Sequence, residues 1–369
     1  MQSKLFGCDC VLAKWFRSAG ATSGRAVAAC VVWTLNAAAL GAGSTEAHWL
    51  PPLAVDPGGV TVSGVSSGGF AALQFAVAHS ALVTGVGVIA AGPYYCAQLD
   101  PSRISSVCLK GRPDWRDSVA AVDFAAAVGS IDGPTHLGGL RAWVLAEGAD
   151  PVVATAVVES AWNFLHHYSG ELAHFERLAG AGHSMPTTGH GGQCGATQAP
   201  YLNDCGFDAA GRMLDYLYRD VAPEPDAPSE GPGELKTFDQ AEFVSTWRQL
   251  TGTAAIDDVG YLFVPARCRR GGCRLHVALH GCRQGARQAG EAFVLGSGYI
   301  DWARRHATVV LYPQVRPVGP AWYAPWLPVN PEGCWDWWGY SGADYAVRSG
   351  AQNAAVFAMV QRLLAPVER

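Results

Sequence analysis

Short apolar runs alternate with longer segments of helical character along the first half of the chain. The apolar runs have the length of buried strands and lie at 59–64, 86–92, 141–148 and 173–179. The helical segments between and after them lie at 68–80, 151–168 and 209–221. In the segment 151–168, Pro151 is expected to lie in the first turn of the helix, where proline is tolerated. Strands that alternate with helices predict an α/β fold with a mostly parallel sheet and helices on both faces.

The composition changes abruptly at residues 222–234, "APEPDAPSEGPGE", which are rich in proline and acidic residues. This composition predicts a surface linker. The second half then continues the pattern, with predicted strands at 260–266, 274–281 and 307–315 and a helix around 289–306. These strands are also expected to be parallel. Two domains are possible, but we expect one sheet built from both halves, and thus a single catalytic domain over residues 48–369.

The N-terminus has the pattern of an export signal. An apolar run at 26–43 is followed by small residues and preceded by four cations, Lys4, Lys14, Arg17 and Arg25. We therefore predict a signal peptide at 1–47 and a secreted or periplasmic protein. The alternative is an uncleaved transmembrane anchor, for which the alanine-rich run is barely long enough. We expect no stable membrane insertion after cleavage.

Composition narrows the class of protein. Apolar residues make up 49% of the chain and charged residues 15%, and there are 44 glycines. These values are typical of a globular, loop-rich enzyme. The formal net charge of −5 lacks the basic surplus that neutralises phosphates, so nucleic acid is not expected as a partner.

Cysteine usage also favours export. Eight cysteines follow the predicted leader: Cys96, Cys108, Cys194, Cys205, Cys268, Cys273, Cys282 and Cys334. An even number in an exported chain indicates disulfides. Proximity in sequence favours Cys96–Cys108, Cys194–Cys205 and Cys268–Cys273, which leaves Cys282–Cys334 by elimination. Eight cysteines allow 105 pairings, so other connectivities stay open. A zinc site is a weaker alternative, since no CxxC pair has a matching second pair.

Three serines lie among glycines in "SGVSSGG", residues 63–69, between a predicted strand and a predicted helix. In a G-x-S-x-G elbow the nucleophile lies on a strained turn and needs small residues two positions before and after it. Only Ser66 has glycine at both positions, Gly64 and Gly68. We predict that Ser66 is a nucleophile and that the backbone N–H of Ser67 contributes to an oxyanion hole. The alternative is an ordinary Gly/Ser turn.

In this fold class an acid and then a histidine follow the nucleophile, each after a strand. Asp150 follows the predicted strand 141–148, and His183 follows the predicted strand 173–179. We predict that His183 takes the Ser66 proton and that Asp150 orients the imidazole.

Both assignments have alternatives in the sequence. Asp150 precedes a predicted helix, and many aspartates in that position are only N-caps. Asp123 and Asp132 are other acids, but they follow no comparable strand. His190 is the rival of His183, although it lies seven residues further from the strand.

The second oxyanion donor of such esterases comes from a His-Gly loop upstream of the nucleophile. Here the matching stretch, "LHVALHGCRQG" at 275–285, lies far downstream of Ser66. The second half also supplies the strands that the first half lacks before the nucleophile strand. We therefore predict a circularly permuted α/β-hydrolase with 222–234 as the permutation linker and the N–H of Cys282 as second donor. A disulfide to Cys334 would hold this loop. An ordinary strand-to-helix turn is the alternative.

Longer motifs extend this pattern over nearly the whole chain after the leader: "SGVSSGGFAALQFAVAHS", "VIAAGPYYCA", "GAGHSMPT", "LHGCRQG" and "CWDWWGYSGADYAVRSGAQ". Together they resemble poly(3-hydroxybutyrate) depolymerases of the permuted, single-domain kind. The resemblance implies a polyester substrate, no metal or cofactor, and the residues proposed above: the triad Ser66, Asp150 and His183 with the oxyanion donors Ser67 and Cys282.

This chain differs in one respect from many secreted relatives that attack crystalline polymer. Those proteins carry a linker and a separate substrate-binding domain, whereas this chain ends at Arg369 directly after a predicted helix. Crystalline polymer, amorphous polymer and soluble oligomer therefore all stay open as substrates.

The segment 322–345 is unusually aromatic and contains Trp322, Tyr323, Trp326, Trp335, Trp337, Trp338, Tyr340 and Tyr345. Core packing is the default explanation for any single aromatic residue. Packing all of them is harder in a region rich in glycine and proline. We predict that Trp335, Trp337 or Trp338 lines an apolar crevice or adsorption face for a polyester chain.

The sequence thus predicts a secreted serine esterase that cleaves poly(3-hydroxybutyrate) or its oligomers through an acyl-enzyme. A feruloyl or acetyl-xylan esterase is the nearest alternative, because related folds share the "LHG" loop. Such an enzyme would have polar sugar-binding groups in its crevice. A polymer-granule-binding protein without catalytic activity is an alternative of another class.

Overall fold

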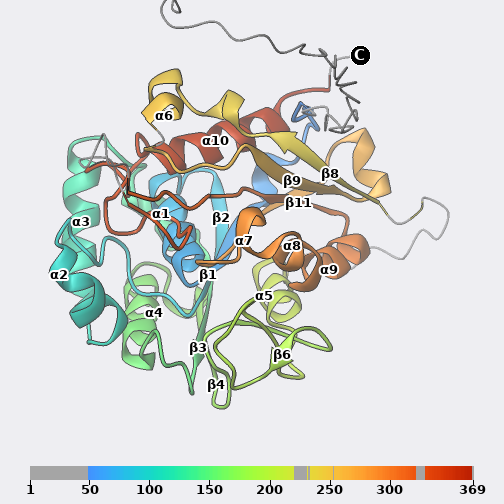
Figure 1. Cartoon of the computed structure of the whole chain (residues 1–369). Helices are drawn as coiled ribbons and strands as arrows, with labels where there is room; N and C mark the ends of the chain where they lie inside the picture. The colour runs from blue at the N-terminus through green and yellow to red at the C-terminus, as the bar shows by residue number, and fades with distance from the viewer. Residues whose placement is uncertain (1–48, 220–230, 232, 252, 321–328, 368–369) are drawn as a thin grey trace, which may run out of the picture. The chain divides into compact units, whose positions relative to one another are not determined.

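Figure 1 shows the computed structural model of the chain. It describes residues 49–219, 231, 233–251, 253–320 and 329–367. The predicted signal peptide at 1–47 and most of the predicted linker at 222–234 lie outside these residues.

An eight-stranded sheet is built from both halves of the chain. Its strands are β1 (Val60–Val65), β2 (Val83–Ile89), β3 (Arg141–Glu147), β4 (Ala173–Leu178), β8 (Glu234–Asp239), β9 (Val259–Val264), β10 (Arg274–Leu279) and β11 (Thr308–Tyr312). Their order across the sheet is β4-β3-β2-β1-β10-β11-β9-β8. The halves meet where β1 pairs in parallel with β10, with Gly64 opposite Leu279. The prediction of one shared sheet is confirmed.

Strand direction departs from the prediction at one edge. The neighbouring strands β4, β3, β2, β1, β10 and β11 run parallel to one another. At the other edge, β9 pairs antiparallel with β11, and β8 pairs antiparallel with β9. The expectation that 260–266 would be a parallel strand is therefore wrong. Its apolar residues are buried as expected, but a continuous apolar run indicates burial without giving direction.

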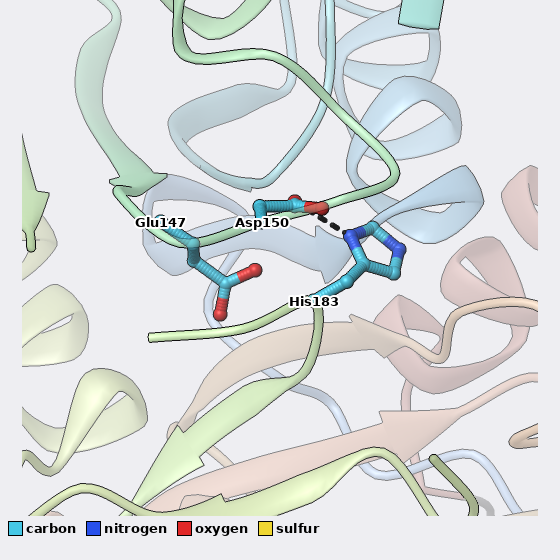
Figure 2. A group of neighbouring side chains, drawn as sticks. All are labelled: Glu147, Asp150 and His183. Carbon is cyan, nitrogen blue, oxygen red and sulfur yellow. Dashed lines mark hydrogen bonds and ion pairs between the residues drawn. The ribbon is translucent and has the colours of Figure 1, made fainter. Parts of the chain in front are cut away.

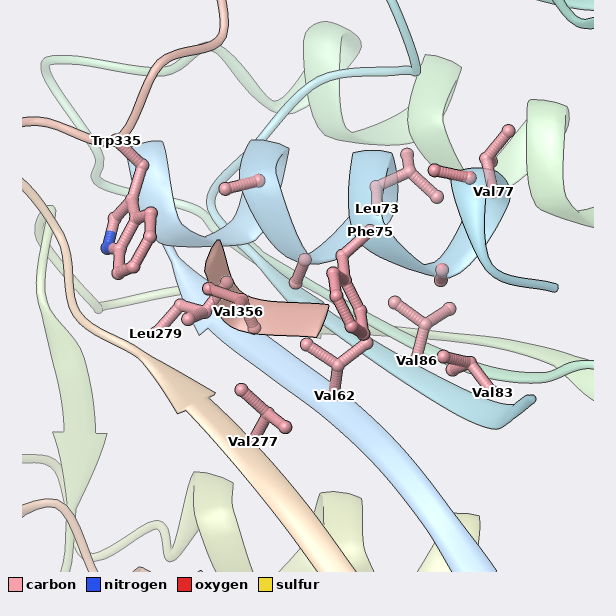
Figure 3. Packing of buried hydrophobic residues seen from close by; sticks show 14 of the residues in the cluster. Val62, Leu73, Phe75, Val77, Val83, Val86, Val277, Leu279, Trp335 and Val356 are labelled. Carbon is pink, nitrogen blue, oxygen red and sulfur yellow. The ribbon is translucent and has the colours of Figure 1, made fainter. Parts of the chain in front are cut away.

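The strands place alternate side chains in two cores, as a pleated strand requires. One core packs against α1, and Figure 3 shows Val62, Val86 and Val277 from three neighbouring strands on this side. The other core packs against α5 and α9, and includes Ala278 and Val310. Both faces of the sheet are thus covered, which is the layered α/β architecture that the sequence predicts.

The helices among the described residues are α1 (Ser67–Ala78), α2 (Pro101–Arg103), α3 (Trp115–Ala127), α4 (Thr155–Ser169), α5 (Ala209–Leu217), α6 (Thr246–Thr251), α7 (Ala286–Ala289), α8 (Ala292–Gly296), α9 (Tyr299–His306) and α10 (Ala351–Leu364). Within the described ranges, no helix combines the length and apolar character needed to cross a membrane.

Two helix predictions need correction. The helix predicted at 151–168 begins at Thr155, because Asp150 and the residues after it form a separate turn. The helix predicted around 289–306 is three short helices, α7 to α9. Gly290 and Gly298, with φ of 59° and 92°, separate them in the left-handed region that interrupts a helix.

All four predicted disulfides are present: Cys96–Cys108, Cys194–Cys205, Cys268–Cys273 and Cys282–Cys334. The second pair joins the residues that directly follow two strands of a small parallel sheet, which the sequence did not predict. Its strands are β5 (Met185–Thr187), β6 (Gly192–Gln193) and β7 (Leu202–Asp204). This small sheet directly follows His183, and so positions a residue of the candidate site.

Candidate active site

Ser66 lies between the end of β1 and the start of α1, as the sequence predicts. Its φ of 57° and ψ of −124° are strained for a residue with a side chain. The flanking glycines make this turn possible. A Cβ at Gly64 would lie 2.3 Å from the Gly68 carbonyl oxygen, and a Cβ at Gly68 would lie 2.3 Å from the Leu279 carbonyl oxygen. The tight turn therefore requires glycine at both positions.

Asp150 and His183 reach Ser66 from the loops after β3 and β4. The Ser66 hydroxyl lies 2.8 Å from His183 Nε2, and His183 Nδ1 lies 2.7 Å from Asp150 Oδ2. Because Nδ1 faces a carboxylate, it carries the ring proton and leaves Nε2 as an acceptor for the serine hydroxyl. The structure thus brings the three predicted residues into one hydrogen-bonded relay.

The Asp150 side chain is only 1% exposed and uses both carboxylate oxygens. One oxygen accepts from His183, while the other accepts from the backbone N–H groups of Val152 and Val153 at 2.6 and 2.9 Å. The turn before α4 therefore does use Asp150 in the manner of an N-cap. These bonds also fix the carboxylate in the orientation that the histidine needs.

The rival residues lie elsewhere. His190 is exposed in its loop, and Asp123 is exposed on α3. Asp132 accepts from the N–H of Ala81 and forms an ion pair with Arg348 at 2.9 Å. None of these side chains takes part in the relay.

Glu147, the last residue of β3, is a second acidic group beside the relay, which the sequence analysis missed (Figure 2). Its side chain is buried and lies near the N–H and hydroxyl of Ser184. Burial, and secondarily the charge of Asp150, raises the pKa of Glu147 well above its ordinary value. Burial therefore favours the neutral form of this carboxyl group. A charged residue type at the end of an apolar strand was the signal for it.

Glu147, Asp150 and His183 also place one ligand atom each within 4.8 Å of one another, a spacing compatible with a metal ion. Asp150 and His183 already share a proton between Nδ1 and Oδ2, the atoms that a cation would need. Glu147, whose pKa is raised by burial, would have to be ionised as well. This donor set fits a held proton better than a metal ion.

The predicted oxyanion loop lies directly against the nucleophile. A Cβ at Gly281 would come within 3.3 Å of Ser66 Cβ. The N–H of Gly281 donates to the Gln284 side chain, and the N–H of Arg283 donates to the Glu332 carbonyl. Within the described part of the chain, the N–H groups of Cys282 and Ser67 have no hydrogen-bond partner. Both N–H groups that the sequence predicts as oxyanion donors are thus without a partner among the described residues.

His280 fixes the peptide unit to which the Cys282 N–H belongs. Its Nδ1 lies 2.7 Å from the Gly281 carbonyl oxygen, and its Nε2 accepts from the Val315 N–H at 3.3 Å. Both bonds require a neutral ring with the proton on Nδ1. Burial, the main cause, lowers the pKa of His280 to about 4, in agreement with this state.

The aromatic prediction is only partly compatible with the structure. Trp335 and Trp337 are 1% and 5% exposed, so they belong to the core and offer no surface to a polymer. Trp337 stacks on Phe70 of α1 at a centroid distance of 4.3 Å. Trp338 is partly exposed and is the remaining candidate of the three. Trp322, Tyr323 and Trp326 lie outside the described residues.

Asp336, which the sequence analysis did not single out, organises the loop of Trp338. Its buried carboxylate accepts from the N–H groups of Trp338, Gly339 and Tyr340 through Oδ1, and from the N–H and hydroxyl of Ser341 through Oδ2. The loop is therefore fixed from inside.

A mostly parallel sheet, with a serine turn after a central strand and an acid and a histidine after later strands, defines an α/β-hydrolase. No model of a known protein family matches the chain. Individual proteins do match. A poly(3-hydroxybutyrate) depolymerase of Delftia acidovorans is 34% identical over 351 residues, which cover 93% of this chain and 65% of that protein. A polyhydroxybutyrate depolymerase of Talaromyces funiculosus is 32% identical over 345 residues, covering 88% of this chain and 95% of that protein.

Solved structures agree. The crystal structure of the PHB depolymerase from Penicillium funiculosum superimposes with a TM-score of 0.74 at 29% identity, covering 86% of this chain and 99% of that one. A PHB depolymerase variant complexed with an R3HB trimer matches equally well. The chain belongs to the poly(3-hydroxybutyrate) depolymerase family.

Proposed function

We propose that this chain is a serine esterase that hydrolyses the ester bonds of poly(3-hydroxybutyrate) or its oligomers through an acyl-enzyme. The observation that carries the proposal is the relay from Ser66 through His183 to Asp150, beside two unpartnered backbone N–H groups. This arrangement supplies a nucleophile, a base, an orienting acid and an oxyanion site in one place.

In the acylation step, Ser66 Oγ attacks the ester carbonyl carbon while its proton passes to His183 Nε2. The tetrahedral intermediate carries an oxyanion, which the N–H groups of Ser67 and Cys282 stabilise. Asp150 stabilises the imidazolium that forms. His183 then donates its proton to the leaving alkoxide oxygen, which departs as the hydroxyl end of one polyester fragment.

Deacylation repeats these roles with water as the nucleophile. His183 takes a proton from the water, which attacks the acyl-serine carbonyl, and the same two N–H groups stabilise the second oxyanion. Collapse of the intermediate breaks the bond to Ser66 Oγ, and His183 returns the proton to it. The other fragment leaves with a new carboxylate end.

The substrate class rests on the relatives. Two of them are named as depolymerases of this polyester, and a solved relative is complexed with an R3HB trimer. The chain spans 65% of the length of the Delftia relative, so the activity of that whole protein is a proposal here. We assign Trp338 to the apolar contact with the polyester, since it is the partly exposed member of its group.

Export is part of the proposal. The predicted signal peptide at 1–47 would direct the chain across the membrane, and four disulfides are typical of proteins that fold outside the cytosol. The pairs Cys268–Cys273 and Cys282–Cys334 both lie next to strand β10.

The test offers purified protein three substrates: amorphous poly(3-hydroxybutyrate) granules, crystalline polymer, and feruloylated or acetylated xylan. We expect release of hydroxybutyrate oligomers by the wild type, and loss of this release by Ser66→Ala with unchanged adsorption to granules. Activity on the xylan esters alone would contradict the proposed substrate. Equal release by Ser66→Ala would contradict the proposed nucleophile.

A further inference from the structure

Gln284 is a buried side chain, 2% exposed, that spans two loops of the proposed active site. Its amide oxygen accepts from the N–H of Gly281 at 2.7 Å. Its amide nitrogen donates to the carbonyl oxygens of Tyr201 at 2.9 Å and Pro200 at 3.2 Å. One side chain therefore satisfies backbone groups that lie about 80 residues apart in sequence, in the two halves of the chain.

On one side, Gln284 selects the N–H group that the oxyanion loop leaves unpartnered. By accepting from Gly281, it removes that N–H from the site. His280 meanwhile holds the Gly281 carbonyl at 2.7 Å. In a trans peptide the carbonyl and the following N–H point in opposite directions, so the Cys282 N–H faces away from His280. Two side chains thus orient one peptide unit.

On the other side, Gln284 is tied to the strand that carries the base. The Tyr201 carbonyl that accepts from Gln284 also accepts from the N–H of Met185 at 2.8 Å. Met185 lies two residues after His183, at the start of β5. A continuous series of hydrogen bonds therefore runs from the oxyanion loop through Gln284 and Tyr201 to the histidine strand.

We infer that Gln284 is a positioning residue, which sets the place of the Cys282 N–H relative to His183. This inference rests on the proposed serine-esterase function. An oxyanion donor acts only when it lies at hydrogen-bond distance from the developing charge, and it acts more strongly in the transition state than in the ground state. Loss of Gln284 should therefore lower kcat with little change in KM.

The test is Gln284→Met, which keeps the length and volume of the side chain but cannot form the three hydrogen bonds. With p-nitrophenyl butyrate as substrate, we expect kcat to fall by about 10²-fold, as when an oxyanion donor is lost, with KM within about threefold of the wild type. The affinity for an alkyl boronic acid, which forms a tetrahedral adduct with the serine, should fall in parallel. The pH dependence of kcat/KM should keep the same midpoint.

The matched control is Asn353→Ala. Asn353 is also a buried amide that donates to two backbone carbonyls, those of Tyr345 and Val347, but it touches no residue of the relay or the oxyanion loop. We expect it to lower thermal stability without lowering kcat. If both variants lower kcat equally at temperatures where both are folded, Gln284 is merely structural and the inference is wrong.

Gln284→Glu separates the two ends of the bridge, since a carboxylate still accepts from Gly281 but cannot donate to Tyr201. Activity equal to the wild type at pH 8 would refute the connection to the histidine strand. If the wild type cleaves p-nitrophenyl butyrate but no hydroxybutyrate oligomer, the substrate proposal fails. The kinetics of the Gln284 variants on p-nitrophenyl butyrate still test the inference in that case. If the wild type cleaves neither ester, both proposals fail.

Discussion

His276, in the middle of β10, should make this protein sensitive to mild acid. Its ring is buried between two hydroxyl groups, with Nδ1 2.7 Å from Thr61 Oγ1 and Nε2 2.7 Å from Ser63 Oγ. Burial lowers the pKa of His276 from 6.5 to about 3. The ring is therefore neutral in the folded protein at every pH above about 3, whereas in the unfolded chain it gains a proton below about 6.5.

The sign of the effect follows from proton binding. Below pH 6.5 the unfolded chain binds more protons than the folded one, so the free energy of unfolding decreases as the pH falls. The decrease is about 1.4 kcal/mol per pH unit between the two pKa values. Between pH 8 and pH 5, His276 alone should remove about 2 kcal/mol, a large part of the roughly 5–15 kcal/mol typical of folded domains.

The assay is equilibrium urea unfolding of the disulfide-intact protein at pH 8, 6 and 5, for the wild type and His276→Gln. Glutamine can still hydrogen-bond to the neighbouring hydroxyls but gains no proton in this range. We expect the variant to be less stable at pH 8 and to lose about 2 kcal/mol less than the wild type on going to pH 5. Other titrating groups act in both proteins and cancel in this difference. Parallel pH curves for the two proteins would refute the reasoning.

Three further predictions concern the site. Gly68→Ala places a Cβ 2.3 Å from a carbonyl oxygen of the neighbouring strand, so it should lower the free energy of unfolding by about 1–3 kcal/mol or more in thermal unfolding. The control is Gly139→Ala, whose Cβ would have no neighbour within 4 Å and which should lower this free energy by less than about 1 kcal/mol. Cys334→Ser opens a disulfide of sequence separation 52. By the loop-entropy model it should lower the free energy of unfolding in urea by about 4 kcal/mol, and kcat should fall as well. Unchanged kcat would show that the disulfide does not hold the proposed oxyanion loop. Glu147→Gln should leave kcat/KM at pH 7 within about threefold, because burial favours the neutral carboxyl group that glutamine mimics. Asp150→Asn should instead lower kcat by about 10⁴-fold. Similar losses in both variants would contradict this difference.

The positions of the proposed triad residues could be predicted from sequence because the proposed chemistry ties residue types to local structure. A serine flanked by glycines after an apolar strand leaves few alternatives, and chain order then restricts the acid and the base. Asp150 and His183 each follow a strand of the parallel sheet, so their side chains meet at one edge. The disulfide Cys282–Cys334 was obtained by elimination, and it required the three short-range pairs to be right.

The errors arose where burial and direction depend on tertiary packing. An aromatic segment does not reveal which side chains turn inward, and Trp335 and Trp337 turn toward the core beside α1. The antiparallel direction of β9 has no signature in its own residues. Gln284 gains its proposed role from contacts with a loop distant in sequence, which no local pattern could indicate.

The pairing of β1 with β10 is what joins two distant parts of the chain into one site. The two strands run parallel and end at the same edge, one directly before Ser66 and the other shortly before Cys282. Their register is held from within by His276, which bonds to Thr61 and Ser63 of the neighbouring strand. A slip by one residue would break both bonds, turn every side chain of one strand to the other face, and move the two proposed oxyanion donors apart by about 3.3 Å. The neutral imidazole that limits stability in acid therefore also fixes the distance across which the proposed oxyanion hole acts.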